Sequence, residues 1–134
     1  MISSACCPIE SLAEYEDTNV VKVVRNHRQL AAYFSRAPIP WIRDGGSSVH
    51  ANMHWSEARR HLGIYAYSVG YLIRFCELTP APTELTEKLE QLRALWHGDA
   101  IVVCDASEIP GPGVDSTQDL RRVAEYFESL PATR

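Results

Sequence analysis

The sequence predicts an α/β domain, and three observations carry this prediction. The run "AIVVCDA" (100–106) is almost continuously apolar and of strand length, which is typical of a strand covered on both faces. The segments on either side of it, 79–98 and the residues after 116, have apolar residues at helical spacing. Strand and helix therefore alternate in the second half of the chain. With 134 residues and 46% hydrophobic residues, one core and a single domain over 1–134 are expected.

The first half predicts a β-ribbon, a long loop and a further strand. The β-prone runs 19–24 and 31–35 are separated by the polar "RNHRQL", the pattern of two strands joined by a turn. Residues 41–57 contain glycines and serines without periodicity, so we expect an exposed loop. "RHLGIYAYSVGYL" (60–72) begins with strand alternation, and a short helix is expected to follow through Cys76.

"TPAPTELTEKLEQLRALWHG" (79–98) predicts one helix. Prolines precede it, Thr83 is positioned to cap it, and Gly98 is positioned to end it in the left-handed conformation. Its expected buried stripe is Leu85, Leu89, Leu92 and Trp96.

A final helix is predicted after 116. Ser116 with Asp119 three residues later approximates a capping box. The expected apolar face is Leu120, Val123, Phe127 and Leu130. Residues 131–134 are expected to form a frayed tail.

Charge and composition exclude several classes of partner. The net charge is −4 and the pI about 5.7, so no basic surface for nucleic acid is expected. No apolar run reaches the roughly 18 residues that span a bilayer, and "MISSACCPIESL" lacks the features of a signal peptide. We therefore expect no membrane partner and a cytoplasmic location.

Cysteine and histidine spacings do not favour a zinc site. The four cysteines match no zinc template and are expected to be reduced and mostly buried. His50 and His54 in "HANMH" would share a helical face, but the glycines and serines before them indicate a loop.

Asp115, in "PGPGVDS", has two readings. An acid at a helix N-terminus is stabilised by the backbone N–H groups and the dipole there. Alternatively, the turn at Gly111 and Gly113 holds the carboxylate at the edge of the sheet, where an acid can ligate magnesium. The residues alone leave both open.

Five motifs in order carry a family resemblance. They are "NVVKVV", "YFSRAPIPWIRD", "RHLGIYAYSVGYL", "LEQLRALWHGDAIVV" and "PGPGVDSTQDLRRV". Together they resemble the C-terminal half of the 3-deoxy-manno-octulosonate (Kdo) cytidylyltransferases, the CMP-Kdo synthetases. The resemblance implies half of a Rossmann-like nucleotidyltransferase fold, a mixed sheet with flanking helices that binds the sugar acid and carries the dimer contact.

The resemblance assigns roles to individual residues. Arg36 and Arg43 resemble basic residues near the substrate, His61 and Tyr65 a sugar-contacting pair, and Glu90 and Gln91 a pair that binds sugar hydroxyls. Asp115 resembles a magnesium ligand. From pattern alone, these residues would be read as loop arginines, a packed histidine and tyrosine, and exposed helix residues.

Two family features find no counterpart in this sequence. These are the glycine- and basic-rich loop that cradles the CTP phosphates and an acidic "GDEP"-like segment with another metal ligand. We therefore expect that the chain alone does not catalyse the implied reaction, in which the anomeric hydroxyl attacks the α-phosphate of CTP and pyrophosphate leaves. Ser68 also departs from the pattern, which has arginine at that position.

Three functions follow as alternatives. The chain is one half of an enzyme completed by a separate nucleotide-binding half, or a dimerisation and binding module, or a repurposed pocket for another small acidic ligand. A homodimer is expected because uncovered sheet edges and apolar surface favour association.

Overall fold

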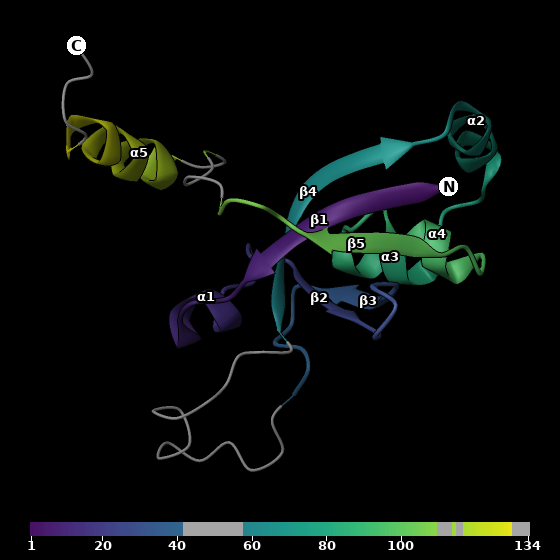
Figure 1. The fold of residues 1–134 in the computed structure, drawn as a ribbon, viewed down its shortest axis with the longest axis horizontal. Helices are drawn as coiled ribbons and strands as arrows, with labels where there is room; N and C mark the ends of the chain where they lie inside the picture. Colours follow the sequence, from purple (N-terminus) through teal and green to yellow (C-terminus); the bar gives the residue numbers. More distant parts are fainter. Residues whose placement is uncertain (42–57, 110–113, 115–116, 130–134) are drawn as a thin grey trace.

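The structure is a computed structural model that describes the chain except for residues 42–57, 110–113, 115–116 and 130–134. Its elements are, in order, β1 (Ile2–Pro8), α1 (Leu12–Glu16), β2 (Lys22–Arg25), β3 (Ala31–Ser35), β4 (Arg59–Tyr67), α2 (Val69–Glu77), α3 (Pro82–Glu87), α4 (Leu92–Trp96), β5 (Ile101–Asp105) and α5 (Thr117–Ser129). The strands form one sheet in the order β3-β2-β4-β1-β5 (Figure 1). β1 and β5 are parallel and the other pairs antiparallel, so the predicted mixed sheet with flanking helices is confirmed.

The N-terminal strand β1 lies inside the sheet, between β4 and β5. The sequence analysis assigned no element to this stretch, because serines and cysteines dilute its apolar pattern. Alternation nevertheless directs Ile2, Ser4 and Cys6 to the core side, and all three are buried. The short helix α1, also not predicted, is capped by the Ser11 hydroxyl, which accepts a hydrogen bond from the Glu14 N–H at 3.1 Å.

The predicted β-ribbon is confirmed. β2 and β3 pair antiparallel, with Val23 opposite Phe34, and both side chains are fully buried. In the connecting turn the Asn26 carboxamide oxygen accepts hydrogen bonds from the N–H groups of Arg28 and Leu30. The expected strand in 60–72 and the helix after it are also confirmed, as β4 and α2.

The single helix predicted over 79–98 is wrong, because the chain forms the two short helices α3 and α4. Lys88 adopts the left-handed conformation (φ 56°) between them. Thr83 does not cap α3; instead the Glu84 carboxylate accepts a hydrogen bond from the Ala81 N–H at 3.0 Å. Gly98 has φ 79°, as expected for the helix end.

The predicted apolar stripe of that helix is only half buried. Leu89 and Leu92 are in the core, whereas Leu85 and Trp96 are 56% and 58% exposed. The reason is the break at Lys88, which changes the phase of the helical pattern between α3 and α4.

β5 is confirmed as a strand, but its expected burial on both faces is not. Ile101 and Val103 are fully buried, while Cys104 on the other face is exposed. β5 is the edge strand of the described sheet, and helices cover only the face of Ile101. Of the four cysteines, Cys6 and Cys7 are buried and the other two exposed, so the expectation of mostly buried thiols holds for half of them.

Helix α5 lies apart from the sheet (Figure 1). The predicted helix is confirmed, but Leu120 and Phe127 on its expected apolar face are 57% and 66% exposed. Leu130, Ser116, the tail 131–134 and almost all of the expected loop 41–57 lie outside the described residues, and so does the side chain of Asp119. Over the described part of the chain, every helix is too short or too polar to span a membrane.

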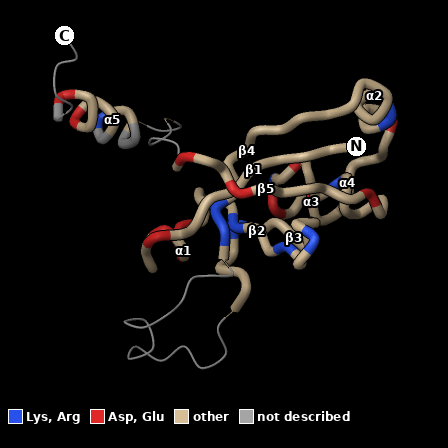
Figure 2. Tube along the Cα trace, in the orientation of Figure 1, with Lys and Arg blue, Asp and Glu red and all other residues tan. Residues whose placement is uncertain are grey.

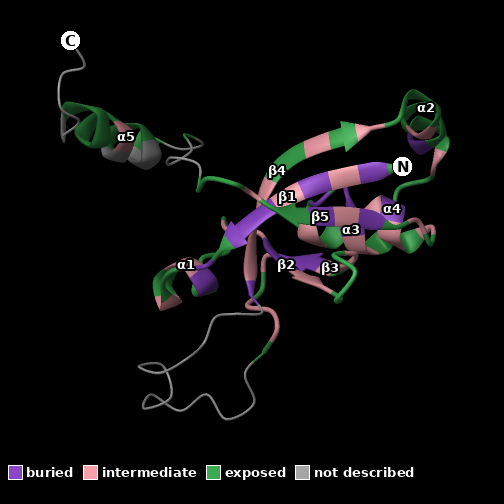
Figure 3. Ribbon diagram, in the orientation of Figure 1, coloured by how far each residue is buried: buried purple, intermediate pink, exposed green. Residues whose placement is uncertain are grey.

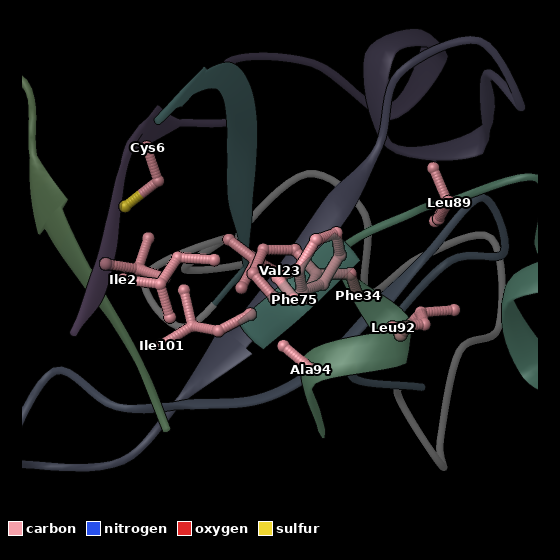
Figure 4. Close-up of a cluster of buried hydrophobic side chains, with 10 residues drawn as sticks. Ile2, Cys6, Val23, Phe34, Phe75, Leu89, Leu92, Ala94 and Ile101 are labelled. Atoms are coloured by element: carbon pink, nitrogen blue, oxygen red, sulfur yellow. The ribbon is translucent and has the colours of Figure 1, made fainter. Parts of the chain in front are cut away.

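The core lies between one face of the sheet and helices α2, α3 and α4. In β1 the residues Ile2, Ser4, Cys6 and Cys7 are buried, and in β5 Ile101 and Val103 are buried, so the buried positions gather in the middle of the sheet (Figure 3). Figure 4 shows Ile2 and Ile101 from the sheet, Phe75 from α2, and Leu92 and Ala94 from α4 in one cluster. Burying side chains of this size contributes about 1.5 to 3 kcal/mol each.

Candidate functional site

A row of rings runs along β4 on the core side of the sheet. The ring centroids are 4.9 Å apart for Phe34 and His61, 5.3 Å for His61 and Tyr65, and 5.8 Å for Tyr65 and Tyr67. We call these four residues the aromatic row. Their tilted and edge-to-face contacts are favourable ring geometries. The structure thus brings His61 and Tyr65 together on one strand face, as the sequence indicated.

A bulge in β4 sets the spacing of this row. Ser4 pairs with Tyr65 and Cys6 pairs with His61, so two steps along β1 correspond to four steps along β4. Gly63 lies inside the bulge with φ 67°, a conformation that favours glycine. Because of the bulge, His61 and Tyr65 lie closer together along the strand than two residues four positions apart in a regular strand. Both lie beside Ser4.

His61 is a neutral hydrogen-bonding group at neutral pH. Its Nε2 lies 2.7 Å from the Ser4 Oγ, and burial lowers the pKa of His61 to about 4. A neutral imidazole has one donor and one acceptor nitrogen. The ring is therefore suited to binding hydroxyl groups rather than to neutralising an anion.

The turn between α3 and α4 carries Glu90 and Gln91, and the Glu90 carboxylate lies near enough to Tyr65 to act on the pKa of its hydroxyl. Burial raises the pKa of the Tyr65 hydroxyl, and the neighbouring Tyr67 and Glu90 raise it further. The Glu90 side chain is 70% exposed, whereas Gln91 is buried. The turn thus offers a solvent-facing carboxylate near a tyrosine hydroxyl that stays protonated.

Arg36, just after β3, is fixed against the end of α3. Its Nε donates to the Glu87 carbonyl at 2.8 Å and its Nη1 to the Thr18 carbonyl at 3.0 Å. Its own N–H donates to the Glu87 carboxylate at 2.9 Å. These bonds orient the guanidinium while leaving it without a carboxylate partner among these contacts, which suits an arginine that receives an anionic ligand.

Four residues that the sequence analysis considered lie outside the described residues: Arg43, Asp115, His50 and His54. Within the described ranges, His, Cys, Asp and Glu side chains form no group of three or more that could hold a metal ion. The expected magnesium site at Asp115 therefore stays a prediction from the sequence.

The sequence analysis missed two polar features near β4. One is Ser4, for which the sequence carried no signal because its strand was not recognised. The other is Asp105 at the end of β5, which accepts from Arg25 Nη2 at 2.6 Å and from Arg59 Nε at 3.3 Å. The Arg25 hydrogen bond and charge hold the pKa of this carboxyl below its usual value.

A further ion pair joins β4 to α1. Arg60 Nη1 lies 3.1 Å from Glu14 Oε1. Figure 2 shows this arrangement as basic positions of β2 and β4 beside acidic positions of α1 and β5. These pairs tie β4, the strand that carries His61, to α1 and β5, and the shared Asp105 also binds Arg25 of β2.

Residues 2–101 match the cytidylyltransferase family. The chain belongs to this family. It is 48% identical over 132 residues to a 3-deoxy-manno-octulosonate cytidylyltransferase of Halorhodospira halophila and 54% identical over 114 residues to that of Alkalilimnicola ehrlichii. The matches cover 96% and 84% of this chain, but 50% and 44% of the relatives.

A solved structure agrees with the sequence relatives. The chain superposes on CMP:2-keto-3-deoxy-manno-octonic acid synthetase complexed with CTP with a TM-score of 0.78 and 36% identity. The superposition covers 96% of this chain and 50% of that one. The predicted resemblance and its nucleotidyltransferase fold are confirmed, and the chain spans about half the length of the relatives it matches.

Proposed function

We propose that this chain supplies the sugar-acid-binding half of an enzyme that transfers CMP from CTP to Kdo. The observation that carries the proposal is the contact of His61 with Tyr65 on β4, together with a Glu90 carboxylate near enough to raise the pKa of the Tyr65 hydroxyl. Family resemblance predicts sugar binding by these three residues and by Gln91, the neighbour of Glu90 in the sequence. Arg36 is held against the helix that leads into the turn at Glu90 and Gln91.

The residues of this half would bind and orient the sugar acid. Arg36 is suited to its carboxylate, because a guanidinium pairs with a carboxylate through parallel hydrogen bonds. His61, Tyr65 and the Glu90–Gln91 pair are suited to its hydroxyls. Held in this way, the anomeric hydroxyl would attack the α-phosphate of CTP while pyrophosphate leaves, a reaction that depends mainly on positioning and charge stabilisation.

CTP and magnesium would be bound mainly by other groups. We propose that a nucleotide-binding half holds the triphosphate, and that Asp115 is the magnesium ligand supplied by this chain. When bound, magnesium would offset charge on the phosphates. We expect no pyrophosphate release from CTP and Kdo by the 134 residues alone. Because CTP is a cytoplasmic substrate, we place the protein in the cytoplasm.

Calorimetric titration of the purified chain with Kdo tests the proposal. Wild-type protein should bind Kdo, and Tyr65→Phe should bind it up to about tenfold more weakly, because one hydrogen bond is lost. Tyr126→Phe, on the exposed helix α5, is the matched control and should bind like wild type. Absence of Kdo binding at millimolar concentration, or equal binding by Tyr65→Phe, would contradict the assignment of this site.

A second candidate function is a dimerisation module. Helix α2 exposes Val69, Leu72 and Ile73, which lie on one helical side and are 45% to 76% exposed. We call these three residues the α2 apolar face. An exposed apolar face of this kind favours association with a second copy of the chain.

A further inference from the structure

Ser4 is buried between two polar groups of β4. Its Oγ lies 2.7 Å from the Ile64 carbonyl oxygen and 2.7 Å from His61 Nε2. Both partners flank Gly63, at the bulge where the β1–β4 ladder is interrupted. One serine hydroxyl therefore bridges the bulge and contacts the histidine ring.

Counting protons assigns the direction of both hydrogen bonds. A carbonyl oxygen can only accept, so the single Ser4 hydroxyl proton is donated to Ile64. The Ser4 oxygen must then accept, and His61 Nε2 must carry the proton that it donates. The opposite arrangement would place two unprotonated oxygens 2.7 Å apart at a buried position, which costs free energy. His61 is thereby held as the Nε2–H tautomer, and Nδ1 keeps its lone pair.

We propose that Ser4 is a positioning residue that fixes the tautomer of His61, so that Nδ1 accepts a hydrogen bond from a hydroxyl of the bound sugar acid. The inference rests on the proposed function for the identity of the ligand. Phe34 and Tyr65 pack on the ring and set its plane, whereas Ser4 decides which nitrogen accepts. Ser4 thus sets the polarity of a group that the sugar would contact.

Nitrogen-15 NMR of the labelled chain reads the tautomer directly, because protonated and unprotonated ring nitrogens have well-separated shifts. In wild type, His61 Nε2 should be protonated and Nδ1 unprotonated at neutral pH. Ser4→Ala should produce a mixture of tautomers, and Ser4→Thr, which keeps the hydroxyl, should restore the wild-type spectrum. Ser3→Ala is the matched control, since Ser3 lies on the same strand and faces the other side of the sheet.

Adding Kdo extends the test to the ligand. In wild type and Ser4→Thr, Kdo should shift the Nδ1 resonance, and Ser4→Ala should bind Kdo up to about tenfold more weakly. An Nδ1–H tautomer in wild type, an unchanged tautomer in Ser4→Ala, or Kdo binding without a shift at Nδ1 would overturn the proposal. The wild-type spectrum decides the tautomer even where Ser4→Ala does not fold. If wild type binds no Kdo, the proposed function fails, while the spectrum without ligand still decides whether Ser4 sets the tautomer.

Discussion

The ammonium group of Lys22 lies 2.6 Å from the carbonyl oxygen of Arg36. Lys22 is fully buried, and its other two N–H groups donate to the carbonyls of Asp17 and Val20. All three ammonium protons are therefore used on backbone oxygens. The lysine joins the turn before β2 to the chain after β3, and so fixes the backbone that carries the proposed anion-binding arginine.

Replacing Lys22 by methionine should destabilise the protein by roughly 2 to 4 kcal/mol, because buried carbonyls lose their donors. Urea denaturation followed by circular dichroism measures this change. Lys88→Met, at an exposed position, is the control and should change the free energy of unfolding little. Equal stability of the two variants would mean that the Lys22 hydrogen bonds contribute little net stability.

His61 should make stability depend on pH. Its pKa is lowered by burial from 6.5 to about 4, so between these values the unfolded chain binds a proton that the folded chain does not. The free energy of unfolding should therefore fall as the pH decreases from 7 to 4, by up to about 3 kcal/mol from this group. Comparing wild type with His61→Gln isolates this contribution. His27→Gln, which removes an exposed histidine, is the control variant.

Glu84 and Arg93 should form the most important ion pair of the α3–α4 region. Arg93 donates to Glu84 through Nε at 2.9 Å and Nη2 at 2.5 Å, and both side chains are largely buried. Glu84→Gln should cost about 2 to 4 kcal/mol, since it leaves the largely buried guanidinium with only the exposed Glu90 carboxylate, 3.8 Å away, as counter-charge. Thermal melts measure the loss, with the exposed Glu77→Gln as control. A melting temperature within error of wild type would contradict this view.

The Glu84 pair should also weaken in acid. Arg93 holds the pKa of Glu84 below its usual value, so its stabilisation is complete above the unfolded pKa of about 4.5. It is lost as the pH falls through the folded value. Glu84→Gln should therefore differ most from wild type near neutral pH, and the difference should shrink in acid.

The α2 apolar face should mediate a homodimer. Ile73→Glu places a charge in the expected interface and should shift the protein toward monomer in light scattering at micromolar concentration. Leu85→Glu, at an exposed position of α3, is the matched control and should leave the mass unchanged. A wild-type protein that is monomeric in this measurement would exclude a stable dimer under these conditions.

Asp115→Asn should separate the two readings of that residue. If Asp115 is a magnesium ligand, manganese or magnesium affinity of the chain, or of its complex with a nucleotide-binding half, should fall by an order of magnitude or more. If it only complements the helix dipole, stability should fall by about 0.3 to 1 kcal/mol with metal affinity unchanged. We expect the first result, measured by calorimetric metal titration alongside a thermal melt.

Sequence patterns by themselves determined the β-ribbon, β4 with α2, β5 and α5. In each, apolar or β-prone residues recur at the period of the element, and local turn residues mark its ends. The order of five motifs also determined the family and the residues His61, Tyr65, Glu90 and Gln91 as candidates. These features are local, so they can be read without knowing which segments meet.

Only the tertiary structure decided how those segments combine. "ISSACCP" became an interior strand because β4 and β5 pair with its two edges, although its own side chains are weakly apolar. The helix over 79–98 broke at Lys88, which lies in the segment between the paired residues Glu84 and Arg93 and directly precedes the buried Leu89. The contact of Ser4 with His61 joins residues 57 positions apart, and it exists because a bulge at Gly63 alters the register. Strand pairing and hydrogen bonding between distant residues depend on the whole fold, so no local pattern in this sequence could have predicted them.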